Sequence, residues 1–132
     1  MPSSREDAYE NPLITRYASA EMASLWGSLR RAREWRRLWI VLATEQQRLG
    51  LAITDDQIAE LTTHADDVDL SAVAEHERRL RHDVMAHVHA YGDQCPSARG
   101  IIHWGATSCF VTDNADLVLI REALEMVRGR LN

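Results

Sequence analysis

The chain has 132 residues, enough for one domain with its own hydrophobic core. Its 15 basic and 20 acidic side chains give a net charge of −5, which argues against a nucleic-acid-binding protein, because such proteins are basic overall. The longest strongly apolar run, Leu38 to Ala43, is far shorter than the roughly 18 residues that a membrane-spanning helix needs, so we expect no membrane partner.

The two cysteines, Cys95 and Cys109, show no C-x-x-C spacing, and the sequence carries no secretory leader. Disulfide frameworks belong to secreted proteins, so we expect reduced thiols and a cytoplasmic protein. With nucleic acid and membrane disfavoured, the expected partners are small molecules or other proteins.

The N-terminal segment begins without a helical pattern. Residues 1–11 are polar, and Pro12 favours an extended neighbour, so we expect an arm that is flexible or held only by a partner. Ser19 is an N-cap candidate for a helix over 20–26, and Gly27 predicts a break before the next helix.

Apolar residues at helical spacing predict a long helix over 29–49, which Gly50 ends. Trp35 and Trp39 are one turn apart, and we expect them to pack in a core or interface rather than to stack on a base. For the arginines of this helix we expect a solvated face or an inter-subunit surface rather than a phosphate site. These are Arg30, Arg31, Arg33, Arg36 and Arg37.

The next helix starts are marked by capping residues. Thr54 to Gln57, T-D-D-Q, matches the capping box and predicts a helix over 55–64. We interpret Asp55 and Asp56 as complements of the helix dipole rather than as a metal or acid/base pair. A helix over 70–91, capped by Asp69 or Ser71, is then expected to bend or restart near His82.

The segment 77–89, E-R-R-L-R-H-D-V-M-A-H-V-H, concentrates arginine and histidine. In one helix, Arg78, His82 and His89 would share a face suited to a polyanionic small molecule, with a solvated, charge-laced face as the alternative. His82 and His89 would lie roughly 10 Å apart, so one helix cannot chelate a metal with them. A zinc site completed by His103 stays open but is disfavoured, because no second ligand pair stands at a usual spacing. The other histidines are expected in packing or interfaces, as for His87 and His89, or on the surface, as for His64 and His76.

The stretch 100–114 is a glycine-punctuated loop that delivers Thr107 and Ser108 just before a predicted helix over 113–129. Hydroxyls and free backbone N–H groups at a helix start can bind an anion. The last helix presents an apolar stripe with nothing in the sequence to pack against, so we expect self-association or a poorly ordered helix. The stripe is Leu117, Ile120, Leu124, Val127 and Leu131.

Three separated motifs occur together in one order: R-Y at 16–17, R-L-R-H-D-V-M-A-H-V-H at 79–89, and G-I-I-H-W-G-A-T-S-C at 100–109. With these motifs the chain resembles the adenylosuccinate lyase branch of the fumarase and aspartase superfamily, and most closely its vertebrate-type members. The resemblance implies an all-α fold. Residues 1–111 would form the N-terminal helical domain, and 112–132 would begin a central helical bundle that continues beyond the sequence.

The resemblance also implies a function. The family eliminates fumarate from adenylosuccinate and from the succinylated carboxamide nucleotide of purine synthesis, as a homotetramer, without a metal or organic cofactor. The matched positions bind the nucleotide substrate, and the catalytic acid and base lie in segments after residue 132. The implied substrate-binding residues are Arg16, Tyr17, Arg81, His82, Asp83, Thr107 and Ser108.

Two alternatives stay open. One is another lyase of the superfamily, such as argininosuccinate lyase, fumarase or aspartase, although the R-H-D and G-A-T-S contexts favour the first interpretation. The other is a non-catalytic helical interaction module. Among the implied binding residues only His82 is of a type that exchanges protons near neutral pH, and one imidazole cannot be acid and base at both ends of the breaking bond. We therefore expect no turnover by this chain alone.

Overall fold

The structure is a computed structural model that describes residues 11–131. The expected flexible arm over residues 1–11 lies outside this range except for Asn11. The described chain is all-α, which confirms the predicted fold class, and among these residues none of the helices combines the length and apolar character that crossing a bilayer takes. The elements are η2 (Leu13–Tyr17), α1 (Ala20–Leu25), α2 (Ser28–Arg48), α3 (Asp55–Thr63), α4 (Leu70–Leu80), α5 (Asp83–Gln94) and α6 (Ser108–Leu131).

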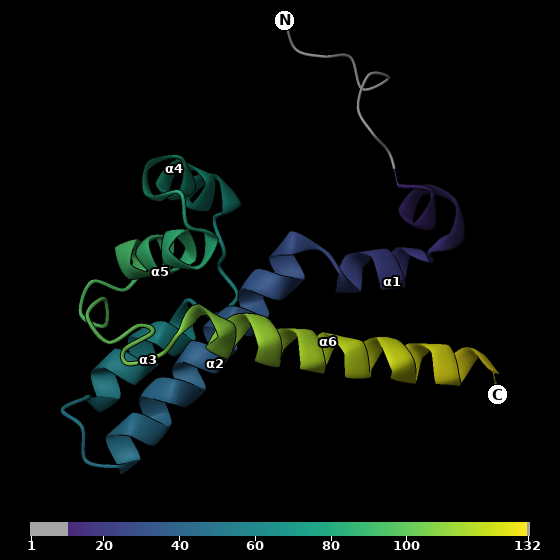
Figure 1. The fold of residues 1–132 in the computed structure, drawn as a ribbon. Coiled ribbons are helices and arrows are strands. Elements are labelled where there is room, and N and C mark those ends of the chain that lie inside the picture. The colour runs from purple at the N-terminus through teal and green to yellow at the C-terminus, as the bar shows by residue number, and fades with distance from the viewer. Residues whose placement is uncertain (1–10, 132) are drawn as a thin grey trace, which may run out of the picture.

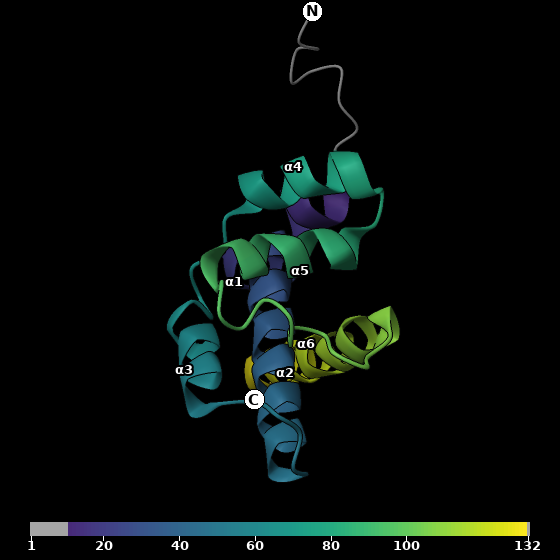
Figure 2. The ribbon, with the colours of Figure 1, turned by 90° about the vertical axis from the view of Figure 1, so that its left-hand side faces the viewer.

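Helix α2 is the axis on which the other elements are assembled (Figure 1). It packs against α3 and α6, while the short α1 contacts both α2 and α6. Helices α4 and α5 form an antiparallel pair that runs across one end of α2, as Figure 2 shows with α2 upright. The C-terminal part of α6 extends away from the α4–α5 pair, so the two ends of this helix have different surroundings.

Trp35 and Trp39 lie in the core, which confirms the packing prediction. Their side chains are 3% and 1% exposed, and their rings meet edge to face with centroids 6.4 Å apart. Trp39 also packs on Tyr91 of α5, at 6.2 Å between ring centroids. Large buried aromatic rings dominate the hydrophobic stabilisation of a small domain, so this contact joins α2 to α5.

The predicted caps are confirmed. The Ser19 hydroxyl accepts from the Met22 N–H at 3.2 Å, and Thr54 and Gln57 form both bonds of a capping box. Of the two candidates before α4, it is Asp69 that caps, with its carboxylate accepting from the first N–H groups of the helix. Gly50 follows α2 with φ = 93°, a conformation that costs glycine little.

The expectation of a solvated or inter-subunit arginine face on α2 is wrong for Arg36, which is only 2% exposed. Its guanidinium donates to the backbone carbonyls of His64 and Asp67 and lies over the Tyr91 ring at 4.2 Å. Burial lowers the pKa of Arg36, because desolvation disfavours the charged form. The two carbonyls and the Tyr91 ring offset this cost and stabilise the charged guanidinium. Arg36 thereby ties α2 to the connection between α3 and α4.

Helix α6 begins at Ser108, five residues before the predicted start. Thr112 and Asn114 lie inside the helix and bond to its backbone: Thr112 Oγ1 donates to the Ser108 carbonyl at 3.3 Å and Asn114 Nδ2 to the Phe110 carbonyl at 2.7 Å. Burial of Val111 against the core favours this early helical turn.

The predicted helix over 70–91 is two helices, with the restart at His82 as expected. Arg81 adopts the left-handed conformation (φ 53°, ψ 36°) that ends α4, and His82 is extended. Arg78, His82 and His89 therefore do not share one helix face. His76 is not a surface residue either, because its side chain is 11% exposed and faces Asp93 of α5.

His87 packs in the helix interface, as expected, with its ring edge to face on Trp35 at 4.9 Å. Burial, reinforced by the nearby Arg36 cation, lowers the pKa of His87 from 6.5 to about 4. The folded protein therefore keeps His87 neutral in a pH range where the unfolded chain protonates it.

This difference predicts acid sensitivity that depends on one residue. The contribution of His87 to the free energy of unfolding is fully present above pH 6.5. It falls by up to about 3 kcal/mol as the pH drops towards 4, because in this range only the unfolded state takes up the proton. His87→Gln should flatten this part of the curve of unfolding free energy against pH, measured by urea denaturation. His64→Gln, which changes a histidine with a 34% exposed side chain at the end of α3, is the control and should keep the wild-type slope. An unchanged slope in His87→Gln would contradict the assignment.

Candidate functional site

Arg81, His82 and Asp83 occupy the sharp turn between α4 and α5. A left-handed residue followed by an extended one reverses the chain within two residues, so the three side chains leave the backbone at one point of the fold. All three are exposed, with 47% of the His82 side chain and 65% of the Asp83 side chain accessible. A turn of this kind presents charged groups to a ligand without burying them.

His82 also caps α5, and this determines the position of its proton. Its Nδ1 accepts from the Met85 N–H at 3.3 Å, so in the neutral ring the proton is on Nε2. Asp83 Oδ1 lies 3.7 Å from the same Nδ1 and stands in the first turn of α5, where a carboxylate complements the helix dipole. His82 can therefore donate from Nε2 to an anion.

His103 is held in the same way by the core. Trp39 Nε1, which can only donate, bonds to His103 Nδ1 at 2.9 Å, so the neutral ring of His103 also carries its proton on Nε2. Burial lowers the pKa of His103, and the nearby His82 lowers it further. His103 has a positive φ of 65°, a costly conformation outside glycine that the Trp39 bond helps to hold.

The segment that carries His103 is a series of tight turns. Ile101 and Trp104 each donate a backbone N–H to the residue three positions earlier. Gln46 of α2 donates to the Trp104 carbonyl at 2.7 Å, and Gly105 continues with φ = 71°. The loop is thus pinned to α2 immediately before Thr107.

Thr107 and Ser108 stand where α6 begins. The first N–H groups of a helix lack internal partners and carry the positive end of the dipole. The first turn of α6 has no acidic residue, in contrast to α3 and α5, so no carboxylate of that turn competes for these donors. The start of α6 is therefore suited to an external carboxylate or phosphate.

Arg81 lines a surface cavity of about 480 Å³ on α4, together with Ala74, Glu77 and Arg78. Two guanidinium groups at one cavity can hold an anion by paired N–H donors. Arg78 also pairs with Glu75 of the same helix. Arg81 is the cation of this cavity that lies at the end of α4, where the turn begins.

Arg16 and Tyr17 lie elsewhere. They end the π-helical turn η2, and Tyr17 borders a small cavity with Met126, Val127 and Arg130 near the end of α6. Met126, which borders this cavity, is 18 residues after Ser108 on α6, and at 1.5 Å per residue the two positions are roughly 27 Å apart. Within one copy of the chain, the structure does not bring Tyr17 and Ser108 to one ligand.

Several of these groups have the chemistry to bind an anion. Arg81 supplies positive charge, His82 and His103 supply oriented Nε2 donors, and Ser108 opens a helix start. Groups of three or more His, Cys, Asp or Glu side chains that could hold a metal are absent from residues 11–131. The disfavoured zinc site with His103 gains no support there.

The sequence motifs do not identify the contact between His103 and the buried Trp39. The sequence indicates His103 only as a possible metal ligand and Trp39 only as a core residue. The available signal was a histidine inside the glycine loop that delivers Thr107, but its partner lies 64 positions earlier on α2. No local pattern connects residues at that separation.

Comparison with known proteins identifies relatives of the chain. No protein-family model matches it. The chain is 50% identical to "Adenylosuccinate lyase" of Schistosoma mansoni over 92% of its own length and 25% of that protein. The protein of the same name from Saccharomyces cerevisiae is 47% identical over 95% of this chain and 27% of its own, and that of Methanocaldococcus jannaschii is 32% identical over 92% and 27%. The chain thus spans about a quarter of the length of the curated relatives it matches.

The Trp39 bond generates a test that needs no substrate. Trp39→Phe keeps the aromatic ring but removes the only donor to His103 Nδ1, so the pKa of His103 should rise towards its ordinary value, and stability should fall by about 1 kcal/mol. Both are measurable, by an NMR pH titration of the imidazole and by urea unfolding. The matched control is Trp35→Phe, because Trp35 Nε1 has no hydrogen-bond partner. An equal shift of the His103 pKa in both variants would refute the tautomer assignment.

Proposed function

We propose, from the homology of this chain to an N-terminal portion of adenylosuccinate lyases, that it supplies substrate-binding residues to an enzyme that eliminates fumarate from adenylosuccinate and from succinylaminoimidazole carboxamide ribotide in purine biosynthesis. The observation that carries this proposal is the 47–50% identity over more than nine-tenths of the chain. The relatives named above share one name, and the alternatives of another superfamily lyase or a non-catalytic module gain no support from them.

The chemistry of the substrate matches the surface around the turn. Adenylosuccinate carries a phosphate and two carboxylates, and elimination needs fixed positive charge and donors for these anions. Arg81 would pair with one anionic group, while His82 would donate from Nε2. Thr107 and Ser108 would bind a carboxylate through hydroxyls and the N–H groups at the start of α6.

The reaction itself needs a base and an acid at opposite ends of the bond that breaks. We propose that Asp83 orients neighbouring groups, and that the base and acid come from parts of the whole enzyme other than this chain. We expect no metal or organic cofactor, and we propose a cytoplasmic location, in keeping with the free thiols of Cys95 and Cys109.

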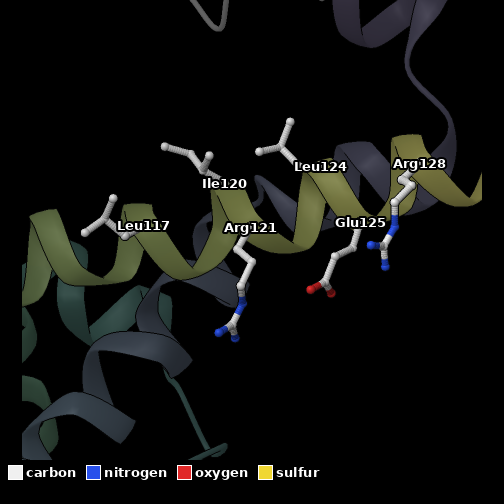
Figure 3. Close-up of a pocket in the computed structure, with 6 residues that line it drawn as sticks. All are labelled: Leu117, Ile120, Arg121, Leu124, Glu125 and Arg128. Carbon is white, nitrogen blue, oxygen red and sulfur yellow. The ribbon is translucent and has the colours of Figure 1, made fainter.

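We further propose that the enzyme is a homo-oligomer, a tetramer as in the resembled family. The stripe on α6 supports this, since Leu117, Leu124 and Leu131 are 65%, 64% and 82% exposed. In Figure 3, Leu117, Ile120 and Leu124 project from one side of the helix and the charged side chains from another. These residues line a groove of about 280 Å³, a feature that usually becomes covered.

The separation of Tyr17 from Ser108 also favours an oligomer. If Arg16 and Tyr17 bind the same substrate as Thr107 and Ser108, they must come from a different copy of the chain, because roughly 27 Å exceeds the reach of one nucleotide.

Helix α6 runs through residues 111 and 112, so the division into a domain over 1–111 and a bundle start at 112–132 stays a proposal about the whole protein.

The function is tested with the whole enzyme and with this chain by following the loss of adenylosuccinate absorbance. The whole enzyme should turn over, whereas the chain alone should show no turnover and only salt-sensitive binding.

In the whole enzyme, Arg81→Ala should raise KM about 10- to 100-fold, and His82→Ala should also lower kcat. Arg48→Ala, which removes an exposed arginine paired only with Glu45 on α2, is the control. Turnover by the chain alone that His82→Ala abolishes would refute this division of roles.

The oligomer is tested by sedimentation velocity across a concentration series. The chain should self-associate, and Leu124→Glu should weaken association at least about tenfold, because a carboxylate in an apolar contact must be desolvated. Leu49→Glu is the matched control, since Leu49 is 81% exposed but lies at the end of α2, away from the stripe. A wild-type chain that stays monomeric at high concentration would contradict the proposal.

A further inference from the structure

Helix α4 has little apolar contact to hold it in place. It packs chiefly against α5, through a small cluster of Val73, Ala86 and Ala90 with Ala72 at its edge. Side chains of this size bury only a few methyl groups, so the hydrophobic gain is small. Arg81, which ends α4 in a left-handed conformation, therefore depends on other contacts for its position.

A cluster of charged groups joins α4 to the C-terminal end of α5, away from the Arg81–Asp83 turn. His76 Nε2 of α4 lies 2.6 Å from Asp93 Oδ2 of α5, and Arg79 lies 2.8 Å from His76 Nδ1. The His89 ring stacks beside His76 at 5.4 Å between centroids. The hydrogen bond from His76 is the largest cause that lowers the pKa of Asp93, and the nearby Arg99 cation lowers it further.

The hydrogen-bonding roles inside the cluster are determined by its chemistry. The Arg79 guanidinium can only donate, so His76 Nδ1 must accept. The Asp93 carboxylate can only accept, so His76 Nε2 must donate. One tautomer of neutral His76 satisfies both neighbours at once, and the contact is a directed pair rather than an incidental surface charge pair.

Asp93 also reaches in the other direction. Its Oδ1 accepts from Arg99 in the loop that follows α5, and the Arg99 side chain crosses Gly92 so closely that a Cβ there would lie 3.0 Å from Arg99 Cγ. That loop continues through His103 to Ser108 at the start of α6. One carboxylate thus contacts both the helix that carries Arg81 and the loop that leads to Ser108.

We propose that His76, Asp93 and Arg99 are positioning residues that hold the Arg81–Asp83 turn and the start of α6 in register for one anionic ligand. The part of this inference that concerns the ligand rests on the function proposed above. None of the three residues needs to touch the substrate, because they act through α4 and through the loop.

The test is amide hydrogen exchange of this chain, followed by kinetics of the whole enzyme. Asp93→Asn should speed exchange in residues 70–83 about tenfold or more and leave the core of α2 unchanged, because it removes a charged hydrogen-bond acceptor shared by two elements. In the whole enzyme it should raise the KM for adenylosuccinate with little change in kcat. Glu75→Gln is the matched control, since Glu75 pairs with Arg78 within α4 and not with α5.

A charge exchange separates positioning from simple damage. His76→Glu alone places two carboxylates face to face and should loosen α4 like Asp93→Asn. Adding Asp93→His restores a histidine–carboxylate pair with the roles reversed and should return α4 protection towards wild type, whereas the loss of the Arg99 contact should keep KM raised. Loss of protection that the double variant does not recover would overturn the pairing.

The outcomes distinguish this inference from the proposed function. Unchanged exchange in Asp93→Asn overturns the inference whatever the enzyme does. Faster exchange with an unchanged KM overturns the positioning role. A whole enzyme that is inactive on adenylosuccinate overturns the proposed function, and the exchange of the Arg81–Asp83 turn in the single and double variants then decides by itself whether the cluster positions the turn.

Discussion

The hydrogen bond from Trp39 to His103 joins the hydrophobic core to the loop that leads into α6. Trp39 is 1% exposed and packs on Tyr91, so the position of its indole is determined by α2 and α5. Its N–H then holds a loop residue in an unfavourable backbone conformation, five positions before α6 begins. Packing of the core therefore determines where α6 starts. The loop before α6 is more rigid than an exposed loop without such a bond, because it is attached to a close-packed interior.

The sequence was sufficient for the parts of the fold that local chemistry decides. The T-D-D-Q cap, Ser19, Asp69 and Gly50 act within a few residues of themselves, and the structure has them in the predicted roles. The sequence predicts the break near His82 but not its consequence, because a left-handed Arg81 turns α5 back along α4. The grouping of Arg78, His82 and His89 on one helix face failed for that reason.

What the sequence could not supply depends on partners far along the chain. Arg36 looks like its neighbours on α2, and only the carbonyls of His64 and Asp67 explain its burial. The early start of α6 depends on Val111 reaching the core. For the candidate site, the motifs named Arg81, His82, Thr107 and Ser108, and the structure added His103 and the distance of Tyr17. Whether these residues bind substrate together stays a prediction.

The separation of Tyr17 from Ser108 within one copy of the chain has a thermodynamic consequence for assembly. On the proposed function, a ligand that contacts Tyr17 of one copy and Ser108 of another is shared between chains, and its binding free energy then contributes to their association. By linkage, assembly must raise affinity for the ligand by the same factor by which the ligand strengthens assembly. Dilution would weaken both at once, so the occupancy of the site would depend on the amount of protein as well as on the amount of substrate.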